Sequence, residues 1–292
     1  MGFKASSHEI FKILSVFGGV PWYLEHLNPN ISADENIKKL CFLQESLLAH
    51  EFDRIFYDIF SKRGEIYKRI MEILVANPCD QMELRRILKY SHSGSVSKYL
   101  EELILSGFVS KHYGWDFKTQ KYKKQAIYRI KDSYIAFYFR YILPHMHLIE
   151  QNKFASKSMN SVDGWDGIVG LQLENLVIAN SDTLCQKLQI SPEDIIASGP
   201  FYQKSSITKK GCQIDYLIQL RQNELYLVEV KFSLHPIGNE VIKQIETKLA
   251  NFDYPKHMIV KPVLIHVSGV EKAVAQSDVL YRVLDFGEFC AR

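Results

Sequence analysis

Two apolar segments joined by a polar turn, residues 211–218 and 225–232, contain charged residues within strand-like sequence. Their β-branched and aromatic residues predict a β-hairpin. The first strand carries Asp215, and the second carries Glu229 with Lys231 two positions later. Because an ionised carboxylate is costly to desolvate unless it is paired or binds a metal, the fold must supply these charges with partners.

The spacing along the hairpin brings the charges together. Side chains alternate between the two faces of a strand, so Glu229 and Lys231 lie on one face. If residues 221–223 form a three-residue loop, the register places Asp215 opposite Glu229; a loop of two or four residues would shift the pairing by one. Like charges at opposed positions destabilise an antiparallel pair by roughly 0.2 to 1 kcal/mol. A divalent cation between them reverses that sign, because Mg²⁺ binds one or two carboxylates together with waters and phosphate oxygens.

Asp215 followed by Glu229-Val230-Lys231 resembles the motif of the PD-(D/E)XK nuclease superfamily. The resemblance implies that Asp215, Glu229 and the Val230 carbonyl bind Mg²⁺ or Mn²⁺. It also implies that Lys231 is catalytic and that an acidic residue on a preceding helix joins the site. Glu174 matches that helical position.

The helix expected around Glu174 gives this residue an unusual setting. Leu171 and Ile178 lie three residues before it and four residues after it, so its carboxylate falls on an apolar helix face. The alternative is an ordinary glutamate at the border of an amphipathic helix. The hairpin charges also have a simpler interpretation, as salt bridges with Lys231 or Lys210. A helix over residues 237–252 and a strand over residues 263–267 complete the order of a nuclease-type fold.

Composition sets the class of protein. The chain has 292 residues, of which 47% are hydrophobic and 24% charged, as in globular proteins with two or three domains. No apolar run approaches the roughly 18 to 20 residues of a membrane span, so we expect no membrane association and a cytoplasmic location. Five scattered cysteines form no Cys-x-x-Cys pair, which argues against a zinc ribbon or a disulfide framework. A net charge of +3 does not by itself identify a nucleic-acid-binding protein.

The middle of the chain has the order of a winged helix: three helices, then two strands around a lysine-bearing loop. Asp80 begins the second helix with Glu83 three residues later, as in a capping box. Gly107 ends the third helix at a left-handed position. Strands at residues 108–111 and 126–130 flank a polar loop over residues 115–125. The aromatic segment over residues 132–149 is expected to pack against its neighbours rather than stack on bases.

A winged helix of this composition suits phosphate contacts better than base recognition, because its third helix begins without Arg, Asn or Gln. The candidate nucleic-acid-binding residues are Ser95, Ser97, Lys98, Lys118, Lys121, Lys123 and Lys124 in this module, and Lys209 and Lys210 before the hairpin. Winged helices also serve as protein-docking modules, so a protein partner is the alternative.

The N-terminal residues 17–24, with the sequence Phe-Gly-Gly-Val-Pro-Trp-Tyr-Leu, resemble a segment in the lid of archaeal-type AAA ATPases. Such ATPases continue into a winged helix and a nuclease-like C-terminal domain, which is the order found here. This chain has no Gly-x-x-x-x-Gly-Lys-Ser/Thr loop to surround nucleotide phosphates, so it contains no ATP site. The resemblance implies the C-terminal part of such an ATPase, with ATP binding outside this chain.

These observations predict a multi-domain α/β chain: a helical lid-like segment over residues 1–60, a winged helix with an aromatic packing helix over residues 61–152, and a restriction-endonuclease-like domain with a central mixed sheet over residues 153–292. The predicted function is Mg²⁺-dependent hydrolysis of DNA phosphodiesters at Asp215, Glu229 and Lys231. The alternative is a non-catalytic module that docks DNA, a protein partner or an ATPase domain.

Overall fold

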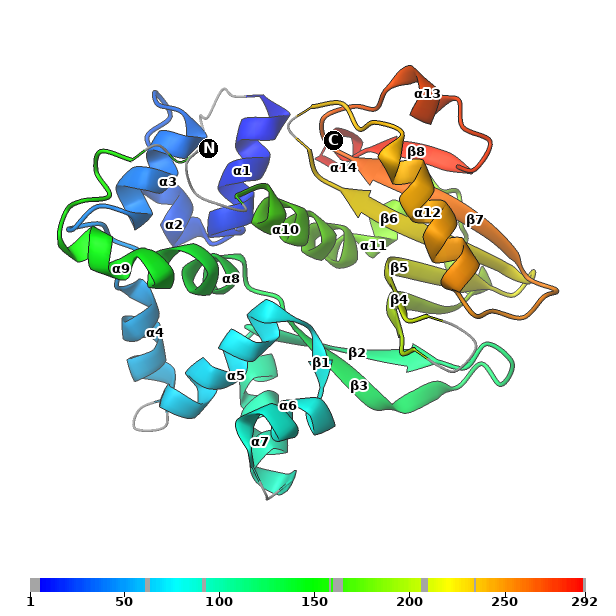
Figure 1. Cartoon of the computed structure of the whole chain (residues 1–292), viewed down its shortest axis with the longest axis horizontal. Helices are drawn as coiled ribbons and strands as arrows, with labels where there is room; N and C mark the ends of the chain where they lie inside the picture. The colour runs from blue at the N-terminus through cyan, green and yellow to red at the C-terminus, as the bar shows by residue number, and fades with distance from the viewer. Residues whose placement is uncertain are drawn as a thin grey trace. The chain divides into compact units, whose positions relative to one another are not determined.

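A computed structural model of the chain describes residues 6–60, 64–90, 93–157, 159, 165–205, 210–233 and 235–290. The chain forms two compact units (Figure 1). Unit 1 consists of residues 1–111 and 126–169, and unit 2 consists of residues 112–125 and 170–292. None of the helices in the described ranges is long and apolar enough to cross a membrane.

Unit 1 begins with four helices, the first three of which start at a capping serine or at a proline. They are α1 (Ser7–Phe17), α2 (Pro21–Glu25), α3 (Ala33–Cys41) and α4 (Glu51–Phe60). The Ser6 hydroxyl accepts a bond from the Glu9 amide, and Ser32 forms a capping box with Glu35. Gly18 ends α1 with φ +59°, a value that favours glycine. The end of α1 therefore has a clear backbone cause.

The second part of unit 1 has three helices and a small sheet, whose hairpin continues into unit 2 over residues 112–125. The helices are α5 (Gly64–Ala76), α6 (Gln81–Leu88) and α7 (Ser93–Leu105), and the strands are β1 (Cys79–Asp80), β2 (Val109–Trp115) and β3 (Tyr122–Ile130), in the order β1-β3-β2. Asp80 accepts a bond from the Glu83 amide, and Gly107 has φ +80°, so both expected helix boundaries are confirmed. The strands extend further into the hairpin than the sequence predicted, because Trp115 is a buried strand residue.

The aromatic segment that follows the hairpin forms α8 (Ser133–Phe137), a π-helical turn η2 (Tyr138–Ile142) and α9 (Leu143–Glu150). Tyr134 is buried and donates its hydroxyl hydrogen to the Leu48 carbonyl at 2.7 Å. The ring of Tyr138 stacks on Phe52 with centroids 4.2 Å apart. These aromatic residues are core residues of unit 1, so the expected packing role is confirmed.

Unit 2 is built on a five-stranded mixed sheet. Its helices are α10 (Trp165–Ala179), most of which belongs to this unit, α11 (Ser181–Lys187), η4 (Pro192–Asp194), α12 (Glu240–Asn251), α13 (Lys272–Ala275) and α14 (Gly287–Cys290), and its strands are β4 (Ile195–Gln203), β5 (Cys212–Leu220), β6 (Glu224–Lys231), β7 (Ile259–His266) and β8 (Arg282–Asp285). The strand order is β4-β5-β6-β7-β8. The first three strands pair antiparallel, and β6, β7 and β8 pair parallel. The predicted α/β class with a central mixed sheet is therefore confirmed.

The β5–β6 hairpin has the register that the three-residue loop requires. Tyr216 pairs with Val228 and Gln219 with Leu225, and residues 221–223 form the turn. Asn223 takes up φ +59°, a left-handed conformation that asparagine tolerates. Continuing the register by one residue from Tyr216 places Asp215 opposite Glu229.

Two apolar clusters hold unit 2 together. Helix α12 crosses one face of the sheet (Figure 1) and packs Val241, Ile242 and Ile245 against Leu264 of β7. The other cluster joins sheet residues to the tip of the β2–β3 hairpin through Trp115. The Trp115 indole donates to the side-chain oxygen of Gln219 at 2.7 Å, so this polar strand residue is satisfied although it is fully buried.

Candidate functional site

The site begins with two buried carboxylates on neighbouring strands. Asp215 on β5 is 7% exposed, and Glu229 on β6 is 1% exposed. One oxygen of Asp215, Oδ2, accepts a bond from the Val230 amide at 2.8 Å, which fixes the carboxylate against the neighbouring strand. The antiparallel register therefore brings together the acidic residues that the sequence predicted to converge.

Two lysines neutralise these carboxylates. Lys231 Nζ lies 3.0 Å from Glu229 Oε1, as expected for residues on one face of β6. Lys248 of α12 donates to the other oxygen, Glu229 Oε2, and lies 3.9 Å from Asp215 Oδ1. Each oxygen of Glu229 therefore contacts a lysine ammonium.

Lys248 was not identified from the sequence, although a signal was present. A lysine on an amphipathic helix is usually read as solvent-facing, since its long side chain can reach water. However, Lys248 follows Val241 and Ile245 at spacings of seven and three residues, so it lies on the apolar stripe of α12. A charge at that position points toward the sheet and needs a partner there.

The electrostatic state of the cluster shows an excess of negative charge. Burial, followed by the neighbouring carboxylates Glu229 and Glu174, raises the pKa of Asp215 to about 7, against the opposing effect of Lys248. Burial lowers the pKa of Lys248, but the attraction of Asp215 and Glu229 outweighs burial and leaves that pKa raised. Glu174 of α10 therefore lies close enough to act on both groups, while its role as a metal ligand remains a prediction.

The donor set suits a divalent cation that keeps waters. Within the described ranges, no three Asp, Glu, His or Cys side chains converge closely enough to enclose a metal ion by themselves. Mg²⁺ needs only one or two carboxylates beside water and phosphate oxygens. The Lys248 ammonium already lies between two carboxylates, so this position attracts a cation. The residues present therefore fit a divalent metal with Asp215, Glu229 and the Val230 carbonyl as candidate ligands.

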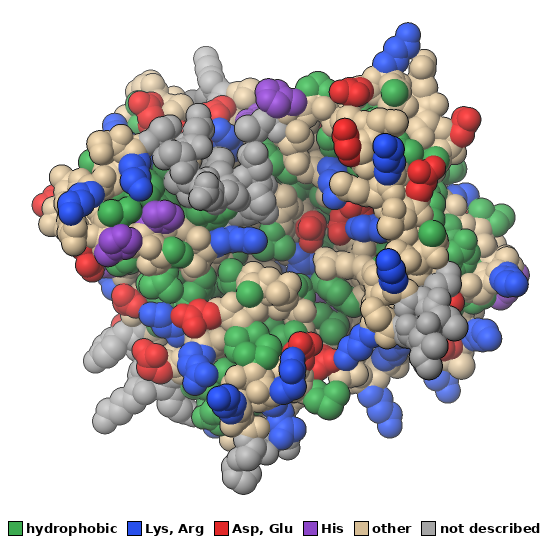
Figure 2. Space-filling view, viewed as in Figure 1, with side chains coloured by type: hydrophobic (Ala, Val, Ile, Leu, Met, Phe, Trp, Pro, Cys, Tyr) green, Lys and Arg blue, Asp and Glu red, His purple; other side chains and the backbone are tan. Residues whose placement is uncertain are grey.

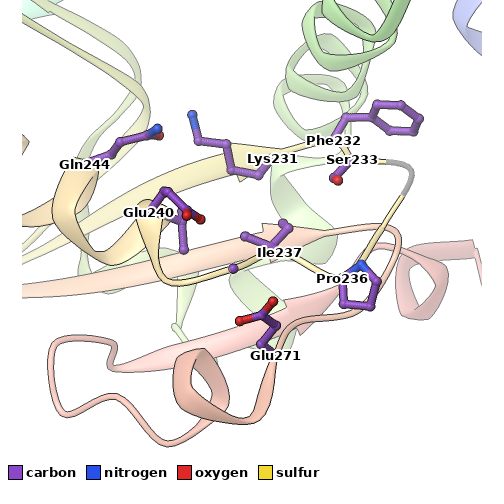
Figure 3. Close-up of a pocket in the computed structure, with 10 residues that line it drawn as sticks. Lys231, Phe232, Ser233, Pro236, Ile237, Glu240, Gln244 and Glu271 are labelled. Carbon is purple, nitrogen blue, oxygen red and sulfur yellow. The ribbon is translucent and has the colours of Figure 1, made fainter.

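A pocket of about 360 Å³ opens beside Lys231. It lies between the end of β6 and the start of α12, and Figure 3 shows the Lys231 and Gln244 side chains on its upper side, with Glu240 and Glu271 below them. The connection after β6 is held in place because Ile237 donates to the Gly269 carbonyl at 3.0 Å and accepts from the Glu271 amide at 3.0 Å. A group bound at Lys231 would therefore have room for its neighbouring atoms.

The residues predicted to bind nucleic acid are placed in different settings. Ser97 accepts a bond from the Gln81 side chain at 2.6 Å, and Lys98 lies 4.0 Å from Glu102, so both have partners within unit 1. Ser95 is half-buried on α7. Of the predicted residues in unit 2, five lysines are exposed: Lys118, Lys121, Lys123 and Lys124 in the hairpin tip and Lys210 before β5. Lys209 lies outside the described residues.

Figure 2 shows cationic side chains over the tip of the β2–β3 hairpin, which belongs to unit 2. An acidic residue, Asp116, lies near these lysines. Bonds from Thr119 have the larger effect in lowering the pKa of Asp116, and the charge of Lys123 lowers it further. A second cationic surface lies on unit 1, where Arg85, Arg86 and Lys89 line a pocket of about 380 Å³ with Met82 and Tyr90.

No protein-family model matches the chain. An uncharacterized protein of Methanocaldococcus jannaschii, MJECL04, is 32% identical over 153 residues, which are 52% of this chain and 33% of that protein. The chain thus spans about a third of the length of this relative. A repair endonuclease from Pyrococcus abyssi is similar over 60% of this chain and 64% of its own, at 11% identity and a TM-score of 0.28.

Proposed function

We propose that unit 2 is a divalent-metal-dependent nuclease module that hydrolyses phosphodiester bonds of DNA. The observation that carries this proposal is the convergence of Asp215, Glu229 and Lys231 on the paired strands β5 and β6. Buried carboxylates beside a lysine at the mouth of a pocket are costly for stability, and such groups concentrate at functional sites.

Each residue has a separate task in this proposal. A bound Mg²⁺ or Mn²⁺ would offset the charge of the phosphate and favour a nucleophilic water. The metal would be held by Asp215, Glu229 and the Val230 carbonyl. The Glu174 carboxylate would add a further negative charge near it. Lys231 is less buried than Glu229 and lines the pocket, so its ammonium can orient the attacking water and stabilise charge that develops on the phosphate.

The pocket and the cationic surfaces support a nucleic-acid substrate. The atoms next to the scissile phosphate would lie in the pocket beside Lys231, where Gln244 offers an amide for hydrogen bonding. The hairpin-tip lysines and Lys210 would contribute sequence-neutral phosphate contacts. In unit 1, the order α5, α6, α7 and the β1–β3 sheet supports a winged-helix interpretation, and Ser95, Ser97 and Lys98 on α7 remain candidates for phosphate contact.

The helical N-terminal part supports the interpretation that the chain corresponds to the C-terminal part of an AAA-type ATPase, with the domain boundaries near residues 60 and 152. ATP binding would then reside in another domain or chain.

The test is cleavage of plasmid and single-stranded DNA with Mg²⁺ or Mn²⁺, comparing the wild-type protein with Lys231→Met. Loss of the ammonium should lower the cleavage rate by at least about 100-fold, the scale of one electrostatic catalytic group. Lys243→Met serves as the matched control, because Lys243 is exposed on α12. Cleavage that persists unchanged in Lys231→Met would refute the assignment of the activity to this site.

A non-catalytic docking module is the second candidate. It is favoured by Lys248, which already neutralises Glu229 without any metal. This candidate predicts DNA or protein binding without cleavage in either metal, and unchanged binding in Lys231→Met.

A further inference from the structure

The cation position between Asp215 and Glu229 is already taken by a side chain. Lys248 Nζ contacts Glu229 Oε2 and lies 3.9 Å from Asp215 Oδ1, while Lys231 contacts the second Glu229 oxygen at 3.0 Å. Lys248 reaches this position from α12, whose apolar residues fix the helix on the sheet. The ammonium is thus held by the packing of the helix as well as by charge.

The charge of the cluster limits how many further cations it can take. When all groups are ionised, the carboxylates of Glu174, Asp215 and Glu229 exceed the two ammonium groups by one negative charge. One divalent cation would reverse this to one positive charge, which a phosphodiester anion then balances. Two divalent cations would leave three excess positive charges around Glu229, which is 1% exposed. Repulsion between such poorly solvated charges is strong.

We propose that Lys248 is a positioning residue that takes the place of a second metal ion, so that the site binds a single divalent cation. This inference rests on the proposed nuclease function and specifies its metal requirement. Lys248 holds the Glu229 carboxylate in place and supplies a fixed positive charge beside the candidate metal ligands Asp215, Glu229 and the Val230 carbonyl.

Removal of the Lys248 charge should therefore change metal binding. Lys248→Met keeps a long apolar side chain on the α12 stripe but leaves the cluster with two excess negative charges. We expect this variant to bind two divalent cations, or one cation at least tenfold more tightly than the wild-type protein. Lys248→Arg keeps the charge and should retain a single cation. A lysine that only packed the helix would give the same stoichiometry and affinity in all three proteins.

The experiment is calorimetric titration of Mn²⁺ into the full chain at pH 8 after dialysis against a chelator, with electron paramagnetic resonance to count bound Mn²⁺. Lys243→Met is the control for a lost surface charge. Lys248→Gln replaces Lys248→Met if circular dichroism shows that the latter does not fold. One Mn²⁺ in the wild-type protein, together with the expected gain in the neutral variant, supports the inference.

Other outcomes overturn it in distinguishable ways. Two Mn²⁺ ions in the wild-type protein, or unchanged binding in the neutral variant, refute the single-cation site while leaving metal-dependent cleavage intact. Mn²⁺ bound only by the neutral variant shows that Lys248 excludes the metal altogether, which also refutes it. If neither protein binds Mn²⁺ and the wild-type protein does not cleave DNA, the proposed function fails together with the inference.

Discussion

Asp215→Asn should make the metal-free protein more stable at alkaline pH. The substitution removes a buried charge, while the amide oxygen can still accept the bond from the Val230 amide that Asp215 accepts at 2.8 Å. In the folded chain, burial and the neighbouring carboxylates Glu229 and Glu174 raise the pKa of Asp215 from 3.8 to about 7. Ionisation therefore costs more free energy in the folded state than in the unfolded state.

The sign and size of the effect follow from linkage. Between pH 4 and pH 7 the unfolded chain releases this proton first, so the free energy of unfolding falls as pH rises and levels off above about pH 7. A shift of roughly three units at 1.36 kcal/mol per unit gives about 4 kcal/mol. At pH 8, Asp215→Asn should raise the free energy of unfolding by up to this amount. At pH 5, where the carboxyl of the folded protein is largely protonated, the gain should be less than about 2 kcal/mol.

The assay is urea unfolding at pH 5 and pH 8 in the presence of a chelator, followed by tryptophan fluorescence, to which the buried Trp115 of unit 2 contributes. Asp116→Asn is the matched control of opposite sign, because bonds from Thr119 lower the pKa of this exposed carboxyl, so the control should not stabilise at pH 8. At a saturating concentration of a divalent cation, the wild-type protein should be more stable than Asp215→Asn, because only the wild-type protein retains the Asp215 carboxylate as a metal ligand. Equal stabilisation at both pH values, or destabilisation at pH 8, would refute the electrostatic reasoning.

Two further predictions concern groups outside the carboxylate cluster. Gln219→Leu should lower the free energy of unfolding by about 1–3 kcal/mol in urea titrations, because it leaves the buried Trp115 indole without its acceptor. A change within experimental error would mean that water replaces the glutamine amide as the acceptor. Burial lowers the pKa of His266 from 6.5 against the opposing effect of Asp285 and Glu288. The folded protein should therefore lose stability as pH falls below 6.5, and NMR should place the His266 titration midpoint below that of the urea-unfolded chain; a higher midpoint would show that the acidic neighbours dominate.

The hairpin was predictable because its information is local. The apolar pattern of β5 and β6 and the polar turn at residues 221–223 fix the register, so the convergence of Asp215 and Glu229 followed from counting residues. The helix boundaries at Asp80 and Gly107 were predictable for the same reason, since a cap depends on neighbouring amides and on one φ angle.

The contacts that escaped prediction join distant parts of the chain. Lys248 lies 19 residues from Glu229, and only the packing of α12 on the sheet decides which way its side chain points. Trp115 and Gln219 are separated by 104 residues. The sequence around Trp115 therefore does not indicate the acceptor of its indole N–H, and the sequence around Gln219 does not indicate the donor to its side-chain oxygen. A glutamine inside a strand as apolar as β5 indicates only that some partner exists.

The division of the chain has a consequence for how such a protein can be inherited. Residues 112–125 belong to unit 2, although the residues before and after them in the sequence belong to unit 1. Trp115, which lies in this stretch, packs in the core of unit 2. A gene fragment that begins at residue 170 would encode the sheet without that tryptophan. Recombination that exchanged the sheet as one continuous cassette would therefore leave a cavity where Trp115 belongs, which favours transmission of the two units as a single genetic block.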